Sequence, residues 1–301
     1  DILDAISTID EVTEKTISKI LTLGEVLSSN IIYKILKQKG FDISYIDSRE
    51  LIFTKDFNNN QVLDSNKTSI SIKNKIKFIN DLSMCGFQKI ETSSFVSPKW
   101  VPQLADAHEV FTKINKVKDV KYTALTPNER GFDNAVNAKV DEVAIFAAAT
   151  ETFSEKNINC NIETSLKRFI PIAKKALKEK IPVRGYISCV SHCPYEGQVN
   201  PQKVAEIAKH LIDMGCYEVS LGDTTGKGSP NVTSGVLEEC LKVLTSDKLA
   251  GHFHDTYQNA LNNIQLCLEK GIKTFDASVG GLGGCPYSPG AKGCLLYTSP
   301  S

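Results

Sequence analysis

The sequence predicts an α/β fold, a (β/α)8 TIM barrel with a piece missing. From about residue 67 to residue 284, amphipathic helical runs of about 10–15 residues alternate with short β-rich runs, which is typical of a parallel sheet. A doubly wound open sheet is the alternative, but such a sheet normally has a glycine-rich phosphate loop after its first strand, and none is found. Seven strand candidates in one series therefore favour an incomplete barrel.

The strand candidates are short and rich in residues that favour strands. The helix candidates between them carry apolar residues at the spacing of a buried helical face, as at Val204, Ile207 and Leu211. Gly86 and Gly215 each precede a strand candidate, where glycine commonly ends a helix. The expected strands are residues 89–94, 121–125, 142–147, 183–190, 218–222, 251–254 and 274–279.

The composition argues against several classes of function. The 301 residues carry 35 Lys and Arg against 35 Asp and Glu, whereas nucleic-acid binders usually carry a basic surplus. No run of ~20 apolar residues is present, so no membrane-spanning helix is expected. The first residues show neither a secretory signal nor a transit segment. We therefore expect neither nucleic acid nor a membrane as a partner.

The nine cysteines are scattered along the chain without a CxxC pair. This spacing argues against a structural zinc site, and a chain of this length needs no disulfide staples. We expect a reducing compartment and mostly buried thiols that pack as small apolar residues. Cys285 is the expected exception.

Chemically active residues gather just after the strand candidates, where the active sites of barrels lie. His252 and His254 are two apart on a strand and should point the same way. They could bind one metal ion or form a hydrogen-bonded structural pair, and their place among carboxylates favours the metal. Asp223 follows another strand, either as an active-site carboxylate or as a cap for the next segment.

Two further segments carry candidate chemistry. In the run SVGGLGGCPY, four glycines let the backbone bend freely and present Cys285 on a loop. A thiol on such a loop can act as proton donor or nucleophile once the loop closes. Glu91 ends the strand in IETSSFVSPKW. It is either an ordinary ion-pair partner or a carboxylate that orients an arginine or a metal-bound group.

From about residue 67 to residue 293 the chain resembles the 3-hydroxy-3-methylglutaryl-CoA lyase family. The matching motifs are IETSSFVSPKWVPQ, NINCNIETSLKRF, VRGYISC followed by CPYEG, MGCYEVSLGDT, HFHDTYQNALNN and SVGGLGGCPY. Gly280 stands where the last motif usually has Ala. The related homocitrate and isopropylmalate synthases share the barrel and the His-x-His pair, but not the GGLGGCPY loop.

The resemblance implies a barrel enzyme that uses Mg²⁺ or Mn²⁺ to cleave 3-hydroxy-3-methylglutaryl-CoA, a small-molecule acyl-CoA, to acetyl-CoA and acetoacetate. It implies that His252 and His254 bind the metal and that His252 lies near the proton transfers. Cys285 would serve proton transfer and loop closure, and Asp223 and Glu91 would be active-site carboxylates. A homodimer in the mitochondrial matrix or cytoplasm, or in the peroxisome, is the expected setting.

The chain departs from the family pattern at two metal ligands. The family's first strand ends in Arg-Asp-Gly-Leu-Gln-Asn-Glu, whose Asp binds the metal, but residues 60–66 read NQVLDSN. Cys294 stands where the family has a ligand Asn, and a thiol is poorly matched to Mg²⁺. A displaced first strand with Arg49 and Glu50 as substitutes is disfavoured by the spacing around it. We therefore expect little or no lyase activity from this chain.

The flanking segments resemble other sequences. Residues from about 23 to 63 resemble part of an aspartate kinase, through GEVLSSNIIYKILKQKG, YIDSRELI and DFNNNQVL. The end, CLLYTSPS, resembles translated library-adapter sequence. These resemblances divide the chain into a foreign segment 1–66, a lyase barrel 67–293 and a non-native tail 294–301. The alternatives to a lyase are an aspartate-kinase fragment and an inactive chimeric fragment.

Overall fold

The computed structural model describes residues 65–99, 101 and 104–279, the strands Thr54–Phe57 and Asn60–Leu63, and residues 34, 37 and 38. Within residues 54–279, side chains are described from residue 72 onward. The chain divides into two compact units, Asp1–Asp81 and Leu82–Ser301. Cys285 with its glycine-rich loop, Cys294 with the tail, and the segment with Arg49 and Glu50 lie outside the described residues.

The described part of the first unit holds a hairpin and most of one helix. β1 (Thr54–Phe57) pairs antiparallel with β2 (Asn60–Leu63), with Phe57 opposite Asn60. The helix α3 (Ser65–Ser83) follows and runs into the second unit. The resemblance places a first barrel strand near residues 60–66, but β2 pairs within a separate two-stranded sheet.

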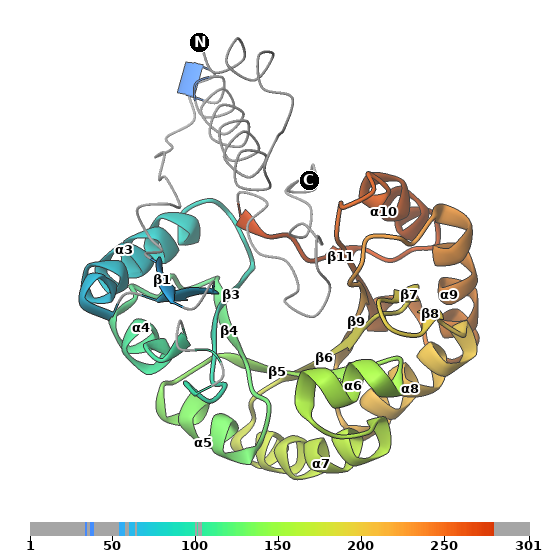
Figure 1. Cartoon of the computed structure of the whole chain (residues 1–301), viewed down its shortest axis with the longest axis horizontal. Coiled ribbons are helices and arrows are strands. Elements are labelled where there is room, and N and C mark those ends of the chain that lie inside the picture. The colour runs from blue at the N-terminus through green and yellow to red at the C-terminus, as the bar shows by residue number, and fades with distance from the viewer. Residues whose placement is uncertain are drawn as a thin grey trace. The chain divides into compact units, whose positions relative to one another are not determined.

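The second unit is built on a seven-stranded sheet whose neighbouring strands are all parallel. The strand order follows the chain in one direction, as in a barrel, whereas a doubly wound sheet reverses. Figure 1 shows these strands curling into an open arc with helices along its outer side. The prediction of an incomplete α/β barrel is therefore confirmed. In spatial order the strands are β3 (Lys89–Ser94), β4 (Lys121–Leu125), β5 (Glu142–Ala148), β6 (Val183–Ser188), β9 (Glu218–Asp223), β10 (Leu249–Phe253) and β11 (Thr274–Phe275).

Local sequence signals set the ends of several helices. Four helices begin at a side chain that accepts a hydrogen bond from a first-turn amide: Asn128, Asn161, Asn200 and Ser229. Gly215 ends α8 at a φ of 119°, a left-handed conformation that favours glycine. The helices are α4 (Ala107–Lys113), α5 (Glu129–Asn137), α6 (Glu151–Ile158), α7 (Ile162–Glu179), α8 (Pro201–Met214), α9 (Pro230–Val243) and α10 (Ala260–Glu269). A short hairpin, β7 (His192–Cys193) and β8 (Gly197–Gln198), and a 3-10 turn (Ser246–Lys248) complete the unit.

The core of the second unit lies between the sheet and its helices. Ile145 of β5 and Ile187 of β6 are fully buried, as are Phe169 and Ile172 of α7. Burying one such side chain is worth roughly 1.5–3 kcal/mol. This apolar layer therefore holds the strands in place and leaves their inner face free to carry polar groups.

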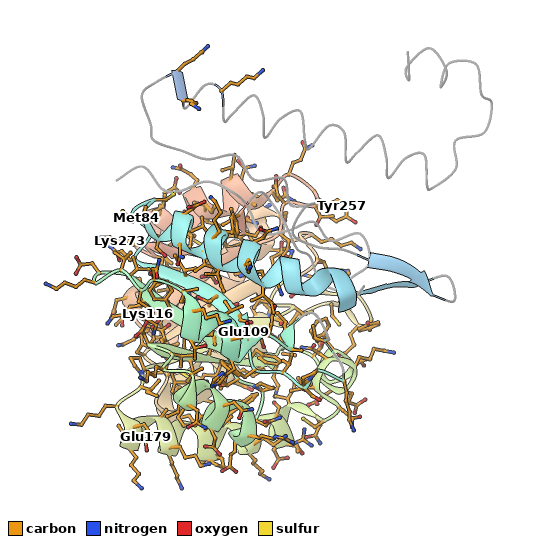
Figure 2. The ribbon with its side chains drawn as sticks, turned by 90° about the vertical axis from the view of Figure 1, so that its left-hand side faces the viewer. Met84, Glu109, Lys116, Glu179, Tyr257 and Lys273 are labelled. Atoms are coloured by element: carbon orange, nitrogen blue, oxygen red, sulfur yellow. The ribbon has the colours of Figure 1, made fainter. Side chains whose placement is uncertain are left out.

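The outer surface of the second unit carries charged side chains. Figure 2 shows Lys116, Glu179 and Lys273 at its periphery. Met84, with 78% of its surface exposed, is an apolar exception. Among the described helices, none is both long and apolar enough to cross a membrane.

Two strands end two or more residues earlier than predicted. β6 stops two residues before the predicted residue 190, because Cys189 has a left-handed φ of 62° and its N–H donates to Thr224 Oγ1 at 2.8 Å. β11 covers only Thr274–Phe275 of the predicted 274–279. The N–H of Asp276 still donates to the carbonyl of Gly251 at 2.9 Å, so the chain stays beside β10 for one more residue.

Candidate active site

Polar side chains from neighbouring strands meet on the inner face of the arc. Alternation along the strands gives Arg184 and Tyr186 of β6 the same face as Ser220 of β9 and His252 of β10. Asp276 follows β11 and hydrogen-bonds to three of these four residues. The network reaches the carboxyl ends of the strands, which is where barrel enzymes place their active sites.

His252 and His254 lie side by side at the carboxyl end of β10. Their Nε2 atoms are 3.3 Å apart and their ring centroids 5.2 Å apart, and His254 is buried. The two side chains thus share one direction, as expected from their spacing. The geometry fits both interpretations, since two nitrogens can face one cation or one imidazole can donate a hydrogen bond to the other.

Asp276 joins three strands through its two carboxylate oxygens. Its Oδ2 accepts a hydrogen bond from Ser220 Oγ at 2.6 Å and lies 3.1 Å from Nδ1 of His252, while its Oδ1 accepts from Arg184 Nη1 at 2.7 Å. Burial alone would raise the pKa of Asp276, but the hydrogen bond with His252 and the charge of Arg184 hold it well below its ordinary value. Asp276 is therefore an anion that contacts one of the predicted metal ligands.

Arg184 is the cation at the centre of this network. Its side chain is 7% exposed, and its Nε donates to Glu218 Oε2 at 2.7 Å in addition to the bond with Asp276. Burial lowers the pKa of Arg184, but the charges of Asp276 and Glu218 raise it above its ordinary value. The guanidinium therefore stays charged and balances two carboxylates.

Tyr186 connects Arg184 to Glu91. Its hydroxyl accepts from Arg184 Nη1 at 2.8 Å and donates to Glu91 Oε2 at 2.9 Å. Burial and the charge of Glu91 raise the pKa of Tyr186 well above its ordinary value, so the phenol keeps its proton. Desolvation and the charge of Asp276 raise the pKa of Glu91, although the residue keeps an exposed surface. Glu91 thus lies in the same network as His252.

Asp223 lies at the end of β9 but faces the other way. It shares a face with Val219 and Leu221, and it is almost fully buried. Its carboxylate accepts hydrogen bonds from Ser191 Oγ and from the Gly228 N–H, the latter at 2.9 Å. Burial raises the pKa of Asp223, although these hydrogen bonds oppose the shift. The carboxylate thus organises the loop after β9, and its role in catalysis stays a prediction.

The sequence analysis did not single out Asp276, Arg184, Tyr186 or Ser220. Arg184 and Tyr186 lie in the motif VRGYISC and Ser220 lies in MGCYEVSLGDT, whereas Asp276 lies in a predicted strand nine residues before Cys285. Of the predicted residues, the structure brings His252, His254 and Glu91 into one region of the arc. Whether Cys285 joins them lies outside the described residues.

The described residues offer only some of the ligands that a bound metal ion needs. Among the described residues, no group of three His, Cys, Asp or Glu side chains is arranged to hold an ion. The two imidazole nitrogens of His252 and His254 fit two positions of a coordination shell.

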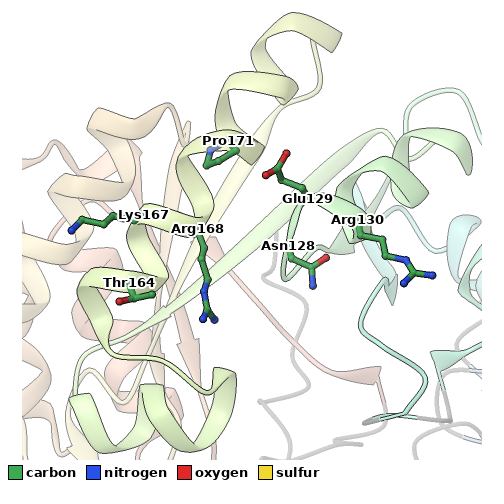
Figure 3. A pocket seen from close by; sticks show the side chains of 7 residues that line it. All are labelled: Asn128, Glu129, Arg130, Thr164, Lys167, Arg168 and Pro171. Carbon is green, nitrogen blue, oxygen red and sulfur yellow. The ribbon is translucent and has the colours of Figure 1, made fainter.

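A hollow lies apart from this network, between the start of α5 and the first half of α7 (Figure 3). Its volume is about 540 Å³. Three cations and one carboxylate are among its lining residues, so the charge of the lining is positive on balance. The lining residues are Asn128, Glu129, Arg130, Thr164, Lys167, Arg168 and Pro171.

The parallel arc and the polar network on its inner face define an enzyme of the α/β-barrel class. The family model described as HMGL-like matches residues 63–291. The chain belongs to the HMGL-like family, and its close relatives are lyases.

Named relatives agree with this assignment. A Pseudomonas aeruginosa 3-hydroxy-3-isohexenylglutaryl-CoA/hydroxy-methylglutaryl-CoA lyase is 52% identical over 231 residues, 77% of each chain. The mitochondrial hydroxymethylglutaryl-CoA lyase of Pongo abelii is 52% identical over 233 residues, 77% of this chain and 72% of that protein. A solved structure of an HMG-CoA lyase from Acinetobacter baumannii, in complex with coenzyme A and 3-methylmalate, matches with a TM-score of 0.71 and 36% identity, over 74% of this chain and 73% of that chain.

Proposed function

We propose that this chain is built to cleave 3-hydroxy-3-methylglutaryl-CoA to acetyl-CoA and acetoacetate with the help of a divalent metal. The observation that carries the proposal is the pair of adjacent Nε2 atoms of His252 and His254 on the inner face of a family-typical barrel. His252 and His254 would hold Mg²⁺ or Mn²⁺. When bound, such an ion supplies a Lewis acid for the hydroxyl and carboxylate oxygens of the substrate.

The chain's own residues supply the surrounding acid–base groups. His252 lies in a hydrogen-bonded line that runs through Asp276, Arg184 and Tyr186 to Glu91. A carboxyl group with a raised pKa, such as Glu91, takes up a proton more readily than an ordinary one. Breaking the carbon–carbon bond needs a base for the tertiary hydroxyl and a proton donor for the resulting enolate. We assign the donor role to Cys285 by resemblance.

The hollow beside α5 and α7 is a candidate contact for the nucleotide end of an acyl-CoA. Phosphates are anions, and the hollow presents Arg130, Lys167 and Arg168. The Acinetobacter baumannii relative was solved with coenzyme A, which supports an acyl-CoA as the substrate class. The double variant Arg130→Ala/Lys167→Ala should raise the KM for the acyl-CoA and leave kcat nearly unchanged, and Lys209→Ala on α8 is the matched control. An unchanged KM would contradict this assignment.

We further propose that turnover by this chain is low. The family's first-strand Arg and Asp have no counterpart in residues 60–66, and Cys294 is a soft substitute for Asn. In line with this, β2 pairs with β1 rather than with the parallel sheet. The boundaries at residues 66 and 293 and the aspartate-kinase resemblance of residues 23–63 stay predictions.

The setting of the enzyme is also a proposal. Some relatives are named as mitochondrial and others as cytoplasmic, which supports either of these locations. A homodimer is the expected assembly, and size-exclusion chromatography with light scattering would test it.

Acetoacetate formation from 3-hydroxy-3-methylglutaryl-CoA, measured with the full chain and Mn²⁺, tests the function. We expect slow turnover that EDTA abolishes and that His254→Ala removes. His210→Ala is the matched control, because His210 is an exposed histidine on α8. Turnover that survives both EDTA and His254→Ala would overturn the metal role, and turnover at the level of the relatives would overturn the proposed impairment. If no turnover is detected, Mn²⁺ binding by electron paramagnetic resonance should still be weaker in His254→Ala than in His210→Ala.

A further inference from the structure

The contact between Asp276 and His252 constrains which ring nitrogen of His252 carries the proton. Asp276 Oδ2 lies 3.1 Å from Nδ1 of His252, and Nε2 on the other side of the ring lies 3.3 Å from Nε2 of His254. The two nitrogens of His252 therefore face different partners. A neutral imidazole has one N–H donor and one acceptor nitrogen, so the partner of Nδ1 decides the state of Nε2.

The other bonds to Asp276 show that its carboxylate acts as an acceptor. Arg184 Nη1 donates to Oδ1 at 2.7 Å, and Ser220 Oγ donates to Oδ2 at 2.6 Å. A carboxylate held by a guanidinium and a hydroxyl has only acceptor capacity left for a third partner. The remaining contact, with Nδ1 of His252, is then satisfied only when Nδ1 carries the proton.

We propose that Asp276 is a positioning residue that holds His252 as the Nδ1–H tautomer, with the lone pair of Nε2 turned toward His254. Metal-binding histidines commonly donate their other N–H to a carboxylate, which fixes the ring and makes the ligand nitrogen more basic. Arg184 and Ser220 hold the carboxylate in place. The inference rests on the proposed function only in that it concerns a proposed metal ligand.

Asp276→Asn gives a directional test. The amide oxygen should stay toward the donor Arg184, which turns the amide NH₂ toward Ser220 and His252. An NH₂ group donates, so Nδ1 of His252 must then accept and the proton moves to Nε2. The expected result is a switch of the His252 tautomer from Nδ1–H to Nε2–H.

Glu218→Gln is the matched control. It removes a carboxylate charge from the same guanidinium, since Glu218 Oε2 accepts from Arg184 Nε at 2.7 Å, and the structure records no contact of it with His252. The control should keep the Nδ1–H tautomer. A change in both variants would mean that the tautomer follows the charge around Arg184 rather than the contact with Asp276, and would overturn the proposal.

The experiment is ¹⁵N NMR of the full chain labelled at histidine, recorded without metal or substrate. His252 is assigned by the signals lost in His252→Gln, and circular dichroism checks that each variant is folded. An Nε2–H tautomer in the parent chain overturns the proposal even if Asp276→Asn fails to fold, and so does an unchanged Nδ1–H tautomer in folded Asp276→Asn. An Nδ1–H tautomer in a chain whose Mn²⁺ binding is equal in His254→Ala and His210→Ala supports this inference and counts against the proposed function alone.

Discussion

Replacing Arg184 with methionine should destabilise the second unit strongly. The substitution keeps an apolar stem but removes a guanidinium that donates to Glu218, Tyr186 and Asp276 at 2.7–2.8 Å. The side chain of Glu218 is 8% exposed and that of Asp276 is 20% exposed, so both carboxylates would be left as poorly hydrated anions. Breaking a buried ion pair from one side costs about 3–5 kcal/mol. Since a typical domain is stable by ~5–15 kcal/mol, this is a large share of the total.

Urea unfolding followed by circular dichroism measures the effect. Lys209→Met is the matched control, because Lys209 pairs with Asp213 one helical turn away on α8 and both side chains are at least half exposed. An exposed pair of this kind contributes only about 0.3–0.5 kcal/mol. The double variant Arg184→Met/Glu218→Gln should show whether the loss comes from unpaired charge.

Glu218→Gln removes one of the two carboxylate charges that lose their partner in Arg184→Met. The double variant should therefore lose less stability than the sum of the losses in the two single variants. If Arg184→Met costs no more than Lys209→Met, the buried network contributes no net stability. If the double variant is merely additive, the cost of Arg184→Met does not come from unpaired charge.

Three further predictions concern other parts of the second unit. Gly226→Ala should lower the free energy of unfolding by about 1–3 kcal/mol more than Gly86→Ala. Both glycines have a positive φ, but only at Gly226 would an added Cβ lie 2.6 Å from a backbone carbonyl oxygen. Equal losses in urea unfolding would contradict this prediction. Iodoacetamide should label exposed Cys85 well before Cys267, whose burial raises its pKa to about 12, as peptide mass spectrometry can show. The pKa of Asp276 is lowered in the folded chain, so its contribution to stability is present above about pH 5 and is lost between about pH 5 and pH 1. In Asp276→Asn, the free energy of unfolding should therefore fall less steeply as the pH is lowered. An unchanged fall would refute the ion pair of Asp276 with Arg184.

The elements that could be predicted from the sequence are those set by short-range patterns. The seven strand candidates correspond to β3, β4, β5, β6, β9, β10 and β11, because alternation between apolar strand and amphipathic helix needs only neighbouring residues. The two strand ends that differ by two or more residues, at Cys189 and beyond Phe275, depend on contacts with Thr224 and with β10. A local pattern cannot contain those contacts.

The contacts of the candidate site are likewise of two kinds, those that a local pattern predicts and those that depend on the sheet. His252 and His254 are two residues apart on one strand, so their shared direction follows from strand geometry alone. The bond between Arg184 and Asp276 joins residues 92 positions apart, and it depends on which strands are neighbours and how they are staggered.

The register explains why Asp276 meets His252. Ala250 is opposite Thr274 in the parallel pair of β10 and β11, so two residues further along each chain His252 comes level with Asp276 on the same face. The same register step pairs Ala250 with Ser220 across β9, which brings the hydroxyl of Ser220 to the same carboxylate. An acidic residue in a predicted strand therefore becomes a candidate partner of a histidine only once strand order and stagger are known. This is why the shared direction of the two histidines could be predicted from sequence, whereas the carboxylate that contacts one of them required the sheet.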